Sequence, residues 1–424
     1  MVKAKSEIQQ SEINIGLVGH VDHGKTTLVE SLSGEWTDRH SEEKRRGISI
    51  KLGYADTIFM KCPSCEEPDC YTTQFLAKKG NKCPNCDEEL EILRRVSFVD
   101  APGHEILMAT MISGAALMDG AVLVIAANET CPQPQTREHF ASLTITQVKN
   151  IIIAQNKVEI IPKEKAIENF QDIKEFIKDK IDAPIIPISA AHNANIDLLI
   201  QYIEKYIPTP KRDINVPPLM WVARSFDINK PGYTPNELKG GVIGGSISKG
   251  KLKVGDEITI LPGSLDVNNP GKYIPLSTEI TSLHVGNLLL EEVAPGGLIG
   301  IGTKLDPSLT RADSLIGNVI GYKGKLPPLR YDLHLDIYLL ERVVGIKTLK
   351  NGSKIMKVEK LKFNEKIMLN LGASTLVGTV ILIKKDTAEL KLIKPVCAEK
   401  GDRVAISRLI NKRWRLIGYG IIND

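Results

Sequence analysis

Long apolar runs are missing from this sequence of 424 residues. The most apolar stretch, residues 115–127, is interrupted by Asp119 and falls well short of the roughly 18 apolar residues that a membrane span needs. The first ten residues are polar and charged, without the apolar core of a secretory signal. We therefore expect a soluble, cytosolic protein with no membrane contact.

Compositional bias is missing too. No internal repeat or low-complexity tract stands out, and apolar residues make up 42% and charged residues 25% of the chain, close to the average of globular proteins. These values argue against a fibre, a disordered chain or a small disulfide scaffold. At roughly 150 residues per domain, the length suggests about three domains.

Acidic residues become scarce toward the C-terminus. Residues 328–424 contain 19 Lys and Arg against 10 Asp and Glu, a local excess of +9, although the whole chain carries +4. The first 327 residues therefore carry −5. Such asymmetry points either to a polyanionic partner of the C-terminal part or to an ordinary lysine-rich, solvated surface, and charge alone leaves both open.

Cysteine is sparse, and its spacing indicates metal rather than disulfides, because a cytosolic chain keeps its thiols reduced. Two CxxC pairs hold four of the seven cysteines: Cys62, Cys65, Cys83 and Cys86. This is the spacing of a zinc ribbon, and four thiolates leave no place for water, so we expect a structural zinc knuckle at about residues 60–90. The alternative is a knuckle that stays empty. Cys70 lies between the pairs and could compete as a ligand, whereas Cys131 and Cys397 are expected to be small buried apolar residues.

Apolar runs and helical stretches alternate in the first half of the chain. Strand-like runs lie at residues 13–18, 96–99, 121–126, 150–155 and 185–188. Helical stretches separate them, for example at residues 25–33 and 162–179. This alternation predicts an α/β domain with a doubly wound, mostly parallel sheet that is covered on both faces. Pro208 and Pro210 cannot continue a helix, and we place the end of this domain at residue 208.

Short alternating strands and glycine-rich turns follow. Residues 240–250 are rich in glycine, and residues 251–260 alternate apolar and polar side chains. A second break is expected at residues 326–329, which contain two prolines. The pattern predicts two antiparallel β-barrel domains, at residues 209–327 and 328–424.

The clearest motif is a phosphate-binding loop. Residues 19–26 fit GxxxxGK[ST], follow a predicted strand and open a predicted helix, which is the context that makes this motif credible. The loop N–H groups and the helix N-terminus favour phosphate. Lys25 is expected to reach the β- and γ-phosphates, and the Thr26 hydroxyl is expected to bind Mg²⁺, a cation that prefers oxygen ligands.

Further motifs at strand ends indicate guanine as the base. Asp100, after a predicted strand, can hold Mg²⁺ through water, and Gly103 can donate its N–H to a γ-phosphate. The carboxylate of Glu159, in the run Asn-Lys-Val-Glu, can accept from two N–H groups of guanine, which adenine does not offer. Ser189 and Ala190 end the next strand and can donate a backbone N–H to guanine O6. Carboxyl ends of parallel strands are where open sheets bind ligands.

These motifs resemble those of the translational GTPases, the group of elongation factor Tu. Residues 19–27, 100–105 and 156–159 carry the resemblance. A closer resemblance, to the family of archaeal translation initiation factor 2 gamma subunits, rests on the four-cysteine insertion and on residues 44–54, 225–232, 339–345 and 413–420. It covers the chain from about residue 11 to the C-terminus.

The resemblance implies a GTPase that binds initiator methionyl-tRNA, assembles with alpha and beta subunits into a heterotrimer, and delivers the tRNA to the small ribosomal subunit. The γ-phosphate of GTP would order residues 35–54 and the stretch after Asp100. Intrinsic hydrolysis would be slow and stimulated by a partner, because no arginine finger is evident. Two other readings stay open: an elongator-type factor for another aminoacyl-tRNA, such as the selenocysteine-specific factor, and a scaffold whose GTPase is vestigial.

The resemblance also implies roles for individual residues. The GTP-binding set is Val21, Asp22, His23, Gly24, Lys25, Thr26, Thr27, Gly103, Asn156, Lys157, Glu159, Ser189, Ala190 and Ala191. The Mg²⁺ set is Asp22, Thr26, Gly47, Ser49 and Asp100, and the catalytic set is Lys25, Asp22 and His104, the last orienting the attacking water. Two residues depart from the family pattern, since Ser49 stands where a threonine is usual and Glu159 where an aspartate is usual.

Two surfaces are expected to meet tRNA. The resemblance implies that the terminal adenosine and the amino acid lie near the glycine-rich strand of the first barrel, at Gly244 and Gly245, although both glycines are also typical of tight barrel packing. The basic third domain would hold the acceptor stem through phosphate contacts. The candidates there are Arg408, Lys412, Arg413 and Arg415.

Overall fold

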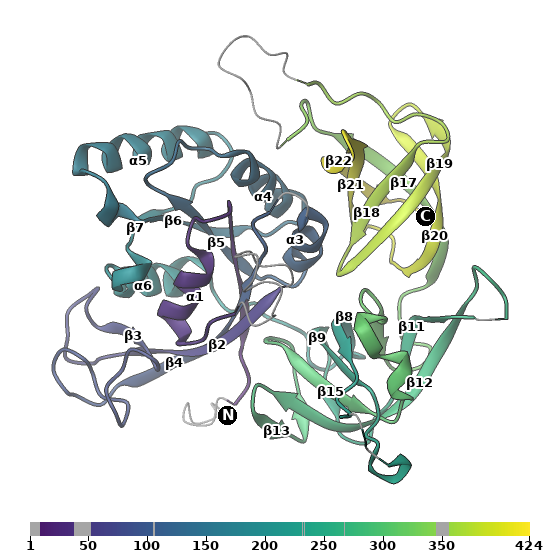
Figure 1. The fold of residues 1–424 in the computed structure, drawn as a ribbon, viewed down its shortest axis with the longest axis horizontal. Helices are drawn as coiled ribbons and strands as arrows, with labels where there is room; N and C mark the ends of the chain where they lie inside the picture. Colours follow the sequence, from purple (N-terminus) through teal and green to yellow (C-terminus); the bar gives the residue numbers. More distant parts are fainter. Residues whose placement is uncertain are drawn as a thin grey trace. The chain divides into compact units, whose positions relative to one another are not determined.

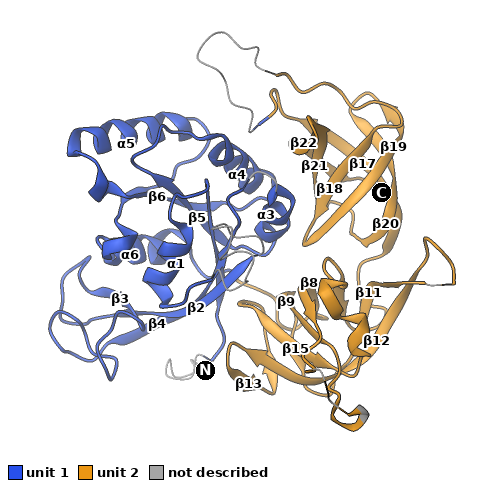
Figure 2. Ribbon diagram, viewed as in Figure 1, with its two compact units in different colours: residues 1–210, 344–354 blue, residues 211–343, 355–424 orange. Residues whose placement is uncertain are grey.

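The structure is a computed structural model, and it describes residues 9–37, 52–104, 107–230, 232, 234–266, 268–344 and 356–424. The chain divides into two compact units (Figure 2). The α/β unit consists of residues 1–210 with 344–354, and the barrel unit consists of residues 211–343 with 355–424. Over the described ranges, no helix is long and apolar enough to cross a membrane.

A seven-stranded sheet forms the centre of the described part of the α/β unit, in the order β3-β2-β4-β1-β5-β6-β7. Its strands are β1 (Ile13–Gly19), β2 (Gly53–Lys61), β3 (Tyr71–Thr73), β4 (Glu91–Asp100), β5 (Gly120–Ala126), β6 (Asn150–Asn156) and β7 (Ile185–Pro187). The strands β4, β1, β5, β6 and β7 are parallel, which confirms the predicted α/β architecture. The sheet also has an antiparallel edge that the sequence did not predict, because β2 pairs antiparallel with both β3 and β4.

Helices cover both faces of this sheet, with α1 and α6 on one side and α3, α4 and α5 on the other (Figure 1). They are α1 (Lys25–Ser33), α3 (Met108–Ala115), α4 (Pro134–Ile145), α5 (Lys163–Ile177) and α6 (Ile196–Tyr206). Helix α1 ends at Gly34, whose φ of 76° is the left-handed cap that favours glycine. Apolar side chains of α1 and α6, such as Leu28 and Leu199, are fully buried against β1, β4, β5 and β6. This packing fixes the carboxyl ends of the parallel strands at one edge of the sheet.

The barrel unit contains two closed β-barrels in its described residues. The first closes in the order β11-β16-β8-β9-β15-β12, with β13 attached to β12. Its strands are β8 (Leu219–Phe226), β9 (Val242–Lys249), β11 (Glu257–Leu265), β12 (Tyr273–Val285), β13 (Leu288–Leu290), β15 (Ile299–Thr303) and β16 (Val319–Gly321), and a small two-stranded sheet joins β10 (Leu252–Lys253) to β14 (Glu292–Val293). The second closes in the order β17-β20-β19-β18-β21-β22. Its strands are β17 (Leu329–Leu339), β18 (Lys366–Leu371), β19 (Ser374–Lys384), β20 (Thr387–Cys397), β21 (Arg403–Ile410) and β22 (Arg413–Ile422).

The two barrels pack against each other within their unit. The Trp221 ring, from β8, packs against the core of the second barrel. It lies so close to Gly372 that a Cβ there would be 2.5 Å from the ring. The Ser374 hydroxyl donates to the carbonyl oxygen of Gly317, which adds a buried hydrogen bond to this junction. The two barrels therefore form a single compact unit rather than two independent domains joined by a linker.

Candidate functional site

The phosphate-binding loop joins β1 to α1 in a conformation that glycine makes possible. Gly19 has φ 145°, and a Cβ on it would lie 2.3 Å from the carbonyl oxygen of Val124 on the neighbouring β5. Gly24 has φ 88° and precedes the first turn of α1. Asp22, at φ 60°, is exposed at the tip of the loop. The loop thus curls over the N-terminus of α1, the arrangement that binds phosphate.

Two buried histidines connect this loop to the neighbouring elements α4 and β5. The Gly19 N–H donates to Nδ1 of His139 on α4 at 2.9 Å, and His139 is 1% exposed. The ring of His23 donates from Nδ1 to the carbonyl oxygen of Val124 at 3.0 Å. Burial lowers the pKa of His23 to about 3 and holds the pKa of His139 well below its usual value. Both rings are therefore neutral, which lets Nδ1 of His139 act as an acceptor.

Lys25 points into the loop. Its side chain is buried, and its ammonium donates to the carbonyl oxygen of His20 at 2.6 Å. The loop after β4 also packs against Lys25. A Cβ on Gly103 would lie 2.5 Å from Nζ of Lys25 and 2.9 Å from the backbone nitrogen of Val21, so only glycine fits at this position. The next residue, His104, is half-buried in this loop. The structure therefore brings Lys25, Gly103 and the loop amides together.

Oxygen ligands gather beside the loop. Thr26 Oγ1 donates to Oδ2 of Asp100 at 2.9 Å, and the carboxylate is 1% exposed at the end of β4. Thr37 Oγ1, which the sequence did not single out, donates to the same oxygen at 2.7 Å. A hydroxyl and a carboxylate are ligands that suit Mg²⁺. Two other residues predicted for this metal, Gly47 and Ser49, lie outside the described residues.

Asn156, at the end of β6, links the phosphate loop to the base side of the site. It is 2% exposed, its Nδ2 donates to the carbonyl oxygen of His23 at 3.0 Å, and its Oδ1 accepts from the N–H of Ala190 at 3.0 Å. A Cβ on Gly24 would lie 2.3 Å from Nδ2, so glycine there admits the amide. Lys157, next in the motif, takes φ 64°. The side chain of Asn156 thus connects the end of β6 to the phosphate loop and to the segment that begins at Ala190.

The remaining predicted residues of the base side follow β6 and β7. Glu159 lies exposed in the short 3₁₀ helix Val158–Ile160. The N–H groups that we assigned to guanine O6 are already used, since Ser189 donates to the carbonyl oxygen of Ala194 at 3.1 Å and Ala190 donates to Asn156. Both N–H groups are thus engaged within the protein in this structure, and the donor to guanine O6 stays a prediction. Thr27, the last member of the predicted set, is half-buried in the first turn of α1.

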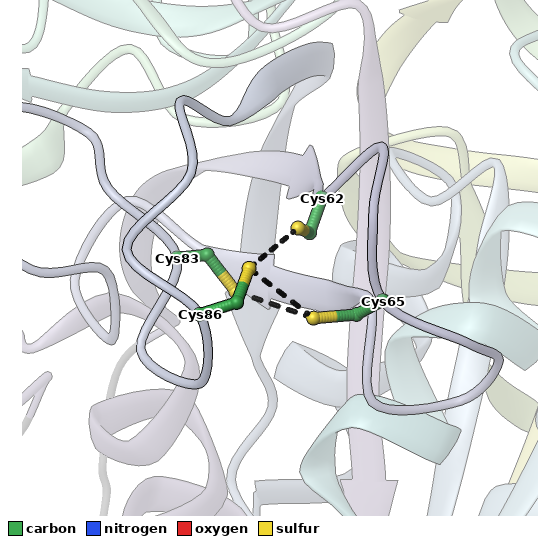
Figure 3. A group of neighbouring side chains, drawn as sticks. All are labelled: Cys62, Cys65, Cys83 and Cys86. Carbon is green, nitrogen blue, oxygen red and sulfur yellow. Dashed lines mark hydrogen bonds between the residues drawn. The ribbon is translucent and has the colours of Figure 1, made fainter.

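The four predicted metal cysteines converge between β2 and β4 (Figure 3). Their sulfurs lie within 4.8 Å of one another, with Cys62 at 3.4 Å and Cys65 at 3.5 Å from Cys86, and Cys65 at 3.7 Å from Cys83. A tetrahedral zinc with Zn–S bonds of about 2.3 Å separates its sulfurs by about 3.8 Å. The cluster therefore has the shape and the thiol chemistry that zinc requires.

The other cysteines stand apart from this cluster. Cys70 is buried in the adjoining apolar core and is not among the four clustered sulfurs, so nothing supports it as a competing ligand. Cys397 is buried as predicted. Cys131 is only half-buried, which corrects the expectation of full burial, and desolvation raises the pKa of its thiol to about 12.

The two predicted tRNA glycines differ from each other. A Cβ on Gly245 would lie 1.9 Å from the carbonyl oxygen of Trp221, so barrel packing alone requires glycine there. A Cβ on Gly244 would meet nothing closer than 3.5 Å, at Arg224 Cβ. Gly244 is paired across the sheet with Gly300, which is in turn paired with His284. Arg224 and His284 thus flank two glycines, of which Gly244 is buried and Gly300 is half-buried.

Two of the four predicted phosphate contacts are not free to reach a phosphate. Arg408 is held by Glu365 and donates to the carbonyl oxygens of Glu359 and Lys360 at 2.8 and 3.1 Å. Arg415 is 7% exposed near the start of β22. Lys412 and Arg413 are exposed at the β21–β22 turn. Of the four predicted residues, these last two are the exposed ones.

Comparison with protein families gives three matches along the chain. Residues 10–209 match the elongation factor Tu GTP binding domain. Residues 240–321 match elongation factor Tu domain 2. Residues 331–422 match the C-terminal region of initiation factor eIF2 gamma.

Full-length relatives are more informative. The chain is 58% identical to translation initiation factor 2 subunit gamma of Pyrococcus furiosus over 99% of both chains, and 58% identical to that of Methanothermobacter thermautotrophicus over 97% of this chain and 99% of the relative. Among solved structures, a bacterial selenocysteine-specific elongation factor has a TM-score of 0.72 at 22% identity, and the match covers 97% of this chain but 58% of that one. Elongation factor SelB of Methanococcus maripaludis, bound to a GTP analogue, has a TM-score of 0.69 at 22% identity, over 98% of this chain and 79% of that one. At these identities the solved structures show the fold alone.

Proposed function

The chain belongs to the family of translation initiation factor 2 gamma subunits, and we propose on that basis that it carries initiator methionyl-tRNA to the small ribosomal subunit. It is a translation initiation GTPase. In the proposed cycle it assembles with alpha and beta subunits, binds the tRNA in the GTP state and releases it after hydrolysis. The observation that carries this proposal is similarity over the full length, including the C-terminal barrel.

The phosphate side of the site accounts for triphosphate binding. Lys25 and the loop amides would hold the β- and γ-phosphates, with Gly103 approaching from the other side. Thr26 and Asp100, with Asp22 and Ser49, would hold Mg²⁺ and its water. Bound there, the cation would neutralise charge that develops on the phosphate oxygens. A hydroxyl donates one proton and still accepts, so Thr26 can keep its bond to Asp100 while its oxygen faces the metal.

Hydrolysis would depend on His104. The residue follows Gly103, and a Cβ on Gly103 would lie 2.5 Å from Nζ of Lys25. A ring at the next position can therefore approach water beside the γ-phosphate. The sequence marks no arginine finger. We therefore expect slow intrinsic hydrolysis and stimulation by a partner.

Guanine would bind at the end of β6. Glu159 would accept from the two N–H groups of the base, and a backbone N–H among residues 189–191 would donate to its O6. Glu159 is exposed and is one methylene longer than the usual aspartate, so its carboxylate can adjust to the base. Lys157 and Asn156 shape this pocket, the second through its bonds to the phosphate loop and to Ala190.

The cysteine cluster would hold a structural zinc. Burial opposes ionisation of Cys62, but the backbone N–H groups of Ser64 and Cys65 and the neighbouring thiol of Cys86 bring its pKa down to about 7. A thiolate is thus available to the metal at neutral pH. Elemental analysis of purified protein is expected to give one zinc per chain, and no zinc would remove this assignment. Substituting Cys62 is expected to abolish binding, whereas substituting Cys70 is not.

Two surfaces of the barrel unit would meet the tRNA. Packing explains Gly245 but not Gly244, which favours a close approach of the aminoacylated end at Gly244 and Gly300. Arg224, whose Nε donates to Asp313 at 3.0 Å, and the exposed His284 flank these glycines. Lys412 and Arg413 would contribute salt-sensitive phosphate contacts to the acceptor stem.

Binding of initiator methionyl-tRNA tests the proposal. With the other two subunits present, we expect tight binding with a GTP analogue and much weaker binding with GDP. Elongator methionyl-tRNA and selenocysteyl-tRNA serve as matched competitors. Equal affinity with both nucleotides, or preference for selenocysteyl-tRNA, would overturn it and favour the elongator alternative. A chain that binds no GTP would instead favour the vestigial scaffold.

A further inference from the structure

The carboxylate at the end of β4 has two hydroxyl partners where the family motif supplies one. Oδ2 of Asp100 accepts from Thr26 at 2.9 Å and from Thr37 at 2.7 Å. Thr26 belongs to the phosphate loop and is a proposed metal ligand itself. Thr37 lies beyond the end of α1, 63 residues from Asp100 in the chain, and no motif marks it.

Thr37 is buried and closely packed, so its hydroxyl can orient the carboxylate of Asp100. It is 8% exposed, and the strand β2 starts against it at Gly53. A Cβ on Gly53 would lie 2.6 Å from Cβ of Thr37, so glycine makes room for this threonine. Two hydroxyls donate to Oδ2, and together they restrict the rotation of the carboxylate about its last torsion. Without the Thr37 donor, that broad torsion is less restricted.

We propose that Thr37 is a positioning residue for magnesium: its hydroxyl fixes the Asp100 carboxylate in the orientation that the cation and its water require. The inference rests on the proposed Mg²⁺–nucleotide site and adds a residue to it. Thr37 itself does not touch the metal in this assignment. It acts as the partner of a ligand, and such partners set metal affinity because they hold the ligand in place.

The test is the magnesium dependence of nucleotide release. A fluorescent, non-hydrolysable GTP analogue, which keeps the γ-phosphate expected to order residues 35–54, is released from the full chain over a range of free Mg²⁺ concentrations, and the concentration that gives half-maximal slowing is measured. Thr37→Val keeps the shape and removes the hydroxyl, so we expect this concentration to rise about 10-fold or more. Release in excess chelator is expected to be unchanged. Thr37→Ser keeps the hydroxyl and is expected to stay within about twofold of wild type.

Two further variants separate positioning from packing. Gly53→Ala keeps the hydroxyl on the Thr37 side chain but displaces that side chain from Asp100, because the new Cβ would lie 2.6 Å from Thr37 Cβ and 3.1 Å from Thr37 Oγ1, and we expect the same shift in Mg²⁺ dependence as for Thr37→Val. Thr136→Val is the matched control, because Thr136 is fully buried on α4 and its hydroxyl has no hydrogen-bond partner in the described part of the chain. It is expected to leave the Mg²⁺ dependence unchanged.

The possible outcomes decide the matter. A wild-type Mg²⁺ dependence in Thr37→Val would overturn the proposal, and so would a defect in Thr37→Ser as large as in Thr37→Val, since that would assign the effect to the methyl group. If the wild-type chain itself released the GTP analogue independently of Mg²⁺, the metal site under the proposed function would fail together with this inference. That result is distinguishable, because it appears before any variant is made.

Discussion

The edge of the sheet that carries the phosphate loop and the outer surface of the barrels differ in how closely the structure fits their predicted residues. At the sheet edge, Lys25 and Asn156 donate to carbonyl oxygens of the phosphate loop, Thr26 donates to Asp100, and Gly103 lies against Lys25. On the barrels, half of the predicted phosphate contacts are paired or buried, and one of the two predicted glycines is explained by packing. The loop motif specifies backbone geometry at every position, whereas a count of basic residues says nothing about which way each one points.

The largest expected effect belongs to the sheet edge. His104→Ala is expected to lower partner-stimulated GTP hydrolysis by about 10²- to 10⁴-fold, the range that a positioned general acid or base contributes. GTP affinity is expected to be unchanged, because His104 is not among the phosphate-binding groups. Stimulated single-turnover hydrolysis and equilibrium GTP binding are the two measurements. A normal stimulated rate would remove His104 from the mechanism and would show that even a motif residue can be misassigned.

The second prediction concerns an anchor of the phosphate loop. His139→Leu removes the acceptor of the Gly19 N–H and leaves that buried donor unsatisfied, which costs about 1–3 kcal/mol. If this cost destabilises the nucleotide-binding conformation of the loop, GDP and GTP affinities are expected to fall by about 5- to 150-fold. His139→Asn offers an amide oxygen near the position of Nδ1 and is expected to restore most of the affinity. Equal affinities of the two variants would mean that the ring only fills space.

His139 and Thr37 also show where sequence-based prediction ends. The parallel strands were predictable because each is a buried apolar run, and the loop residues because a local motif dictates their positions. His139 meets Gly19 across 120 residues, and Thr37 meets Asp100 across 63 residues. Neither contact leaves a local signal, except that α4 carries polar residues such as Glu138 and His139 on a buried face.

The antiparallel edge of the sheet was missed for a related reason. The direction of a strand in a sheet depends on the strand it pairs with. Strand β2 pairs with β4, and residues 62–90 separate the two in the chain, so no local sequence pattern indicates this pairing. The burial of Arg415 has a similar origin. A bulge between Ile406 and Ser407 shifts the register of β21 against β22, so simple alternation does not tell which side chains of β22 face outward.

Adjacent glycines on β9 provide a third test, inside the barrel. Gly245→Ala forces a Cβ to within 1.9 Å of the Trp221 carbonyl oxygen, and overpacking of this kind costs about 1–3 kcal/mol of unfolding free energy. Gly244→Ala meets only ordinary contacts and is expected to leave thermal stability unchanged while weakening binding of the aminoacylated tRNA end. Thermal unfolding and tRNA binding of the two variants are measured side by side. Stable Gly244→Ala protein with normal tRNA affinity would leave this surface without a function.

The smallest effect is expected at the β21–β22 turn. Lys412→Gln with Arg413→Gln removes two exposed positive charges, so the slope of log affinity for tRNA against log salt is expected to fall by up to about two and affinity at moderate salt by a few fold. Arg415→Gln is the matched control of equal chemistry. Its guanidinium is buried, so we expect a loss of stability and no change in the salt slope. A reduced slope in the Arg415 variant but not in the double variant would reverse the assignment, and it would mean that the charge count located the tRNA surface better than the side-chain positions did.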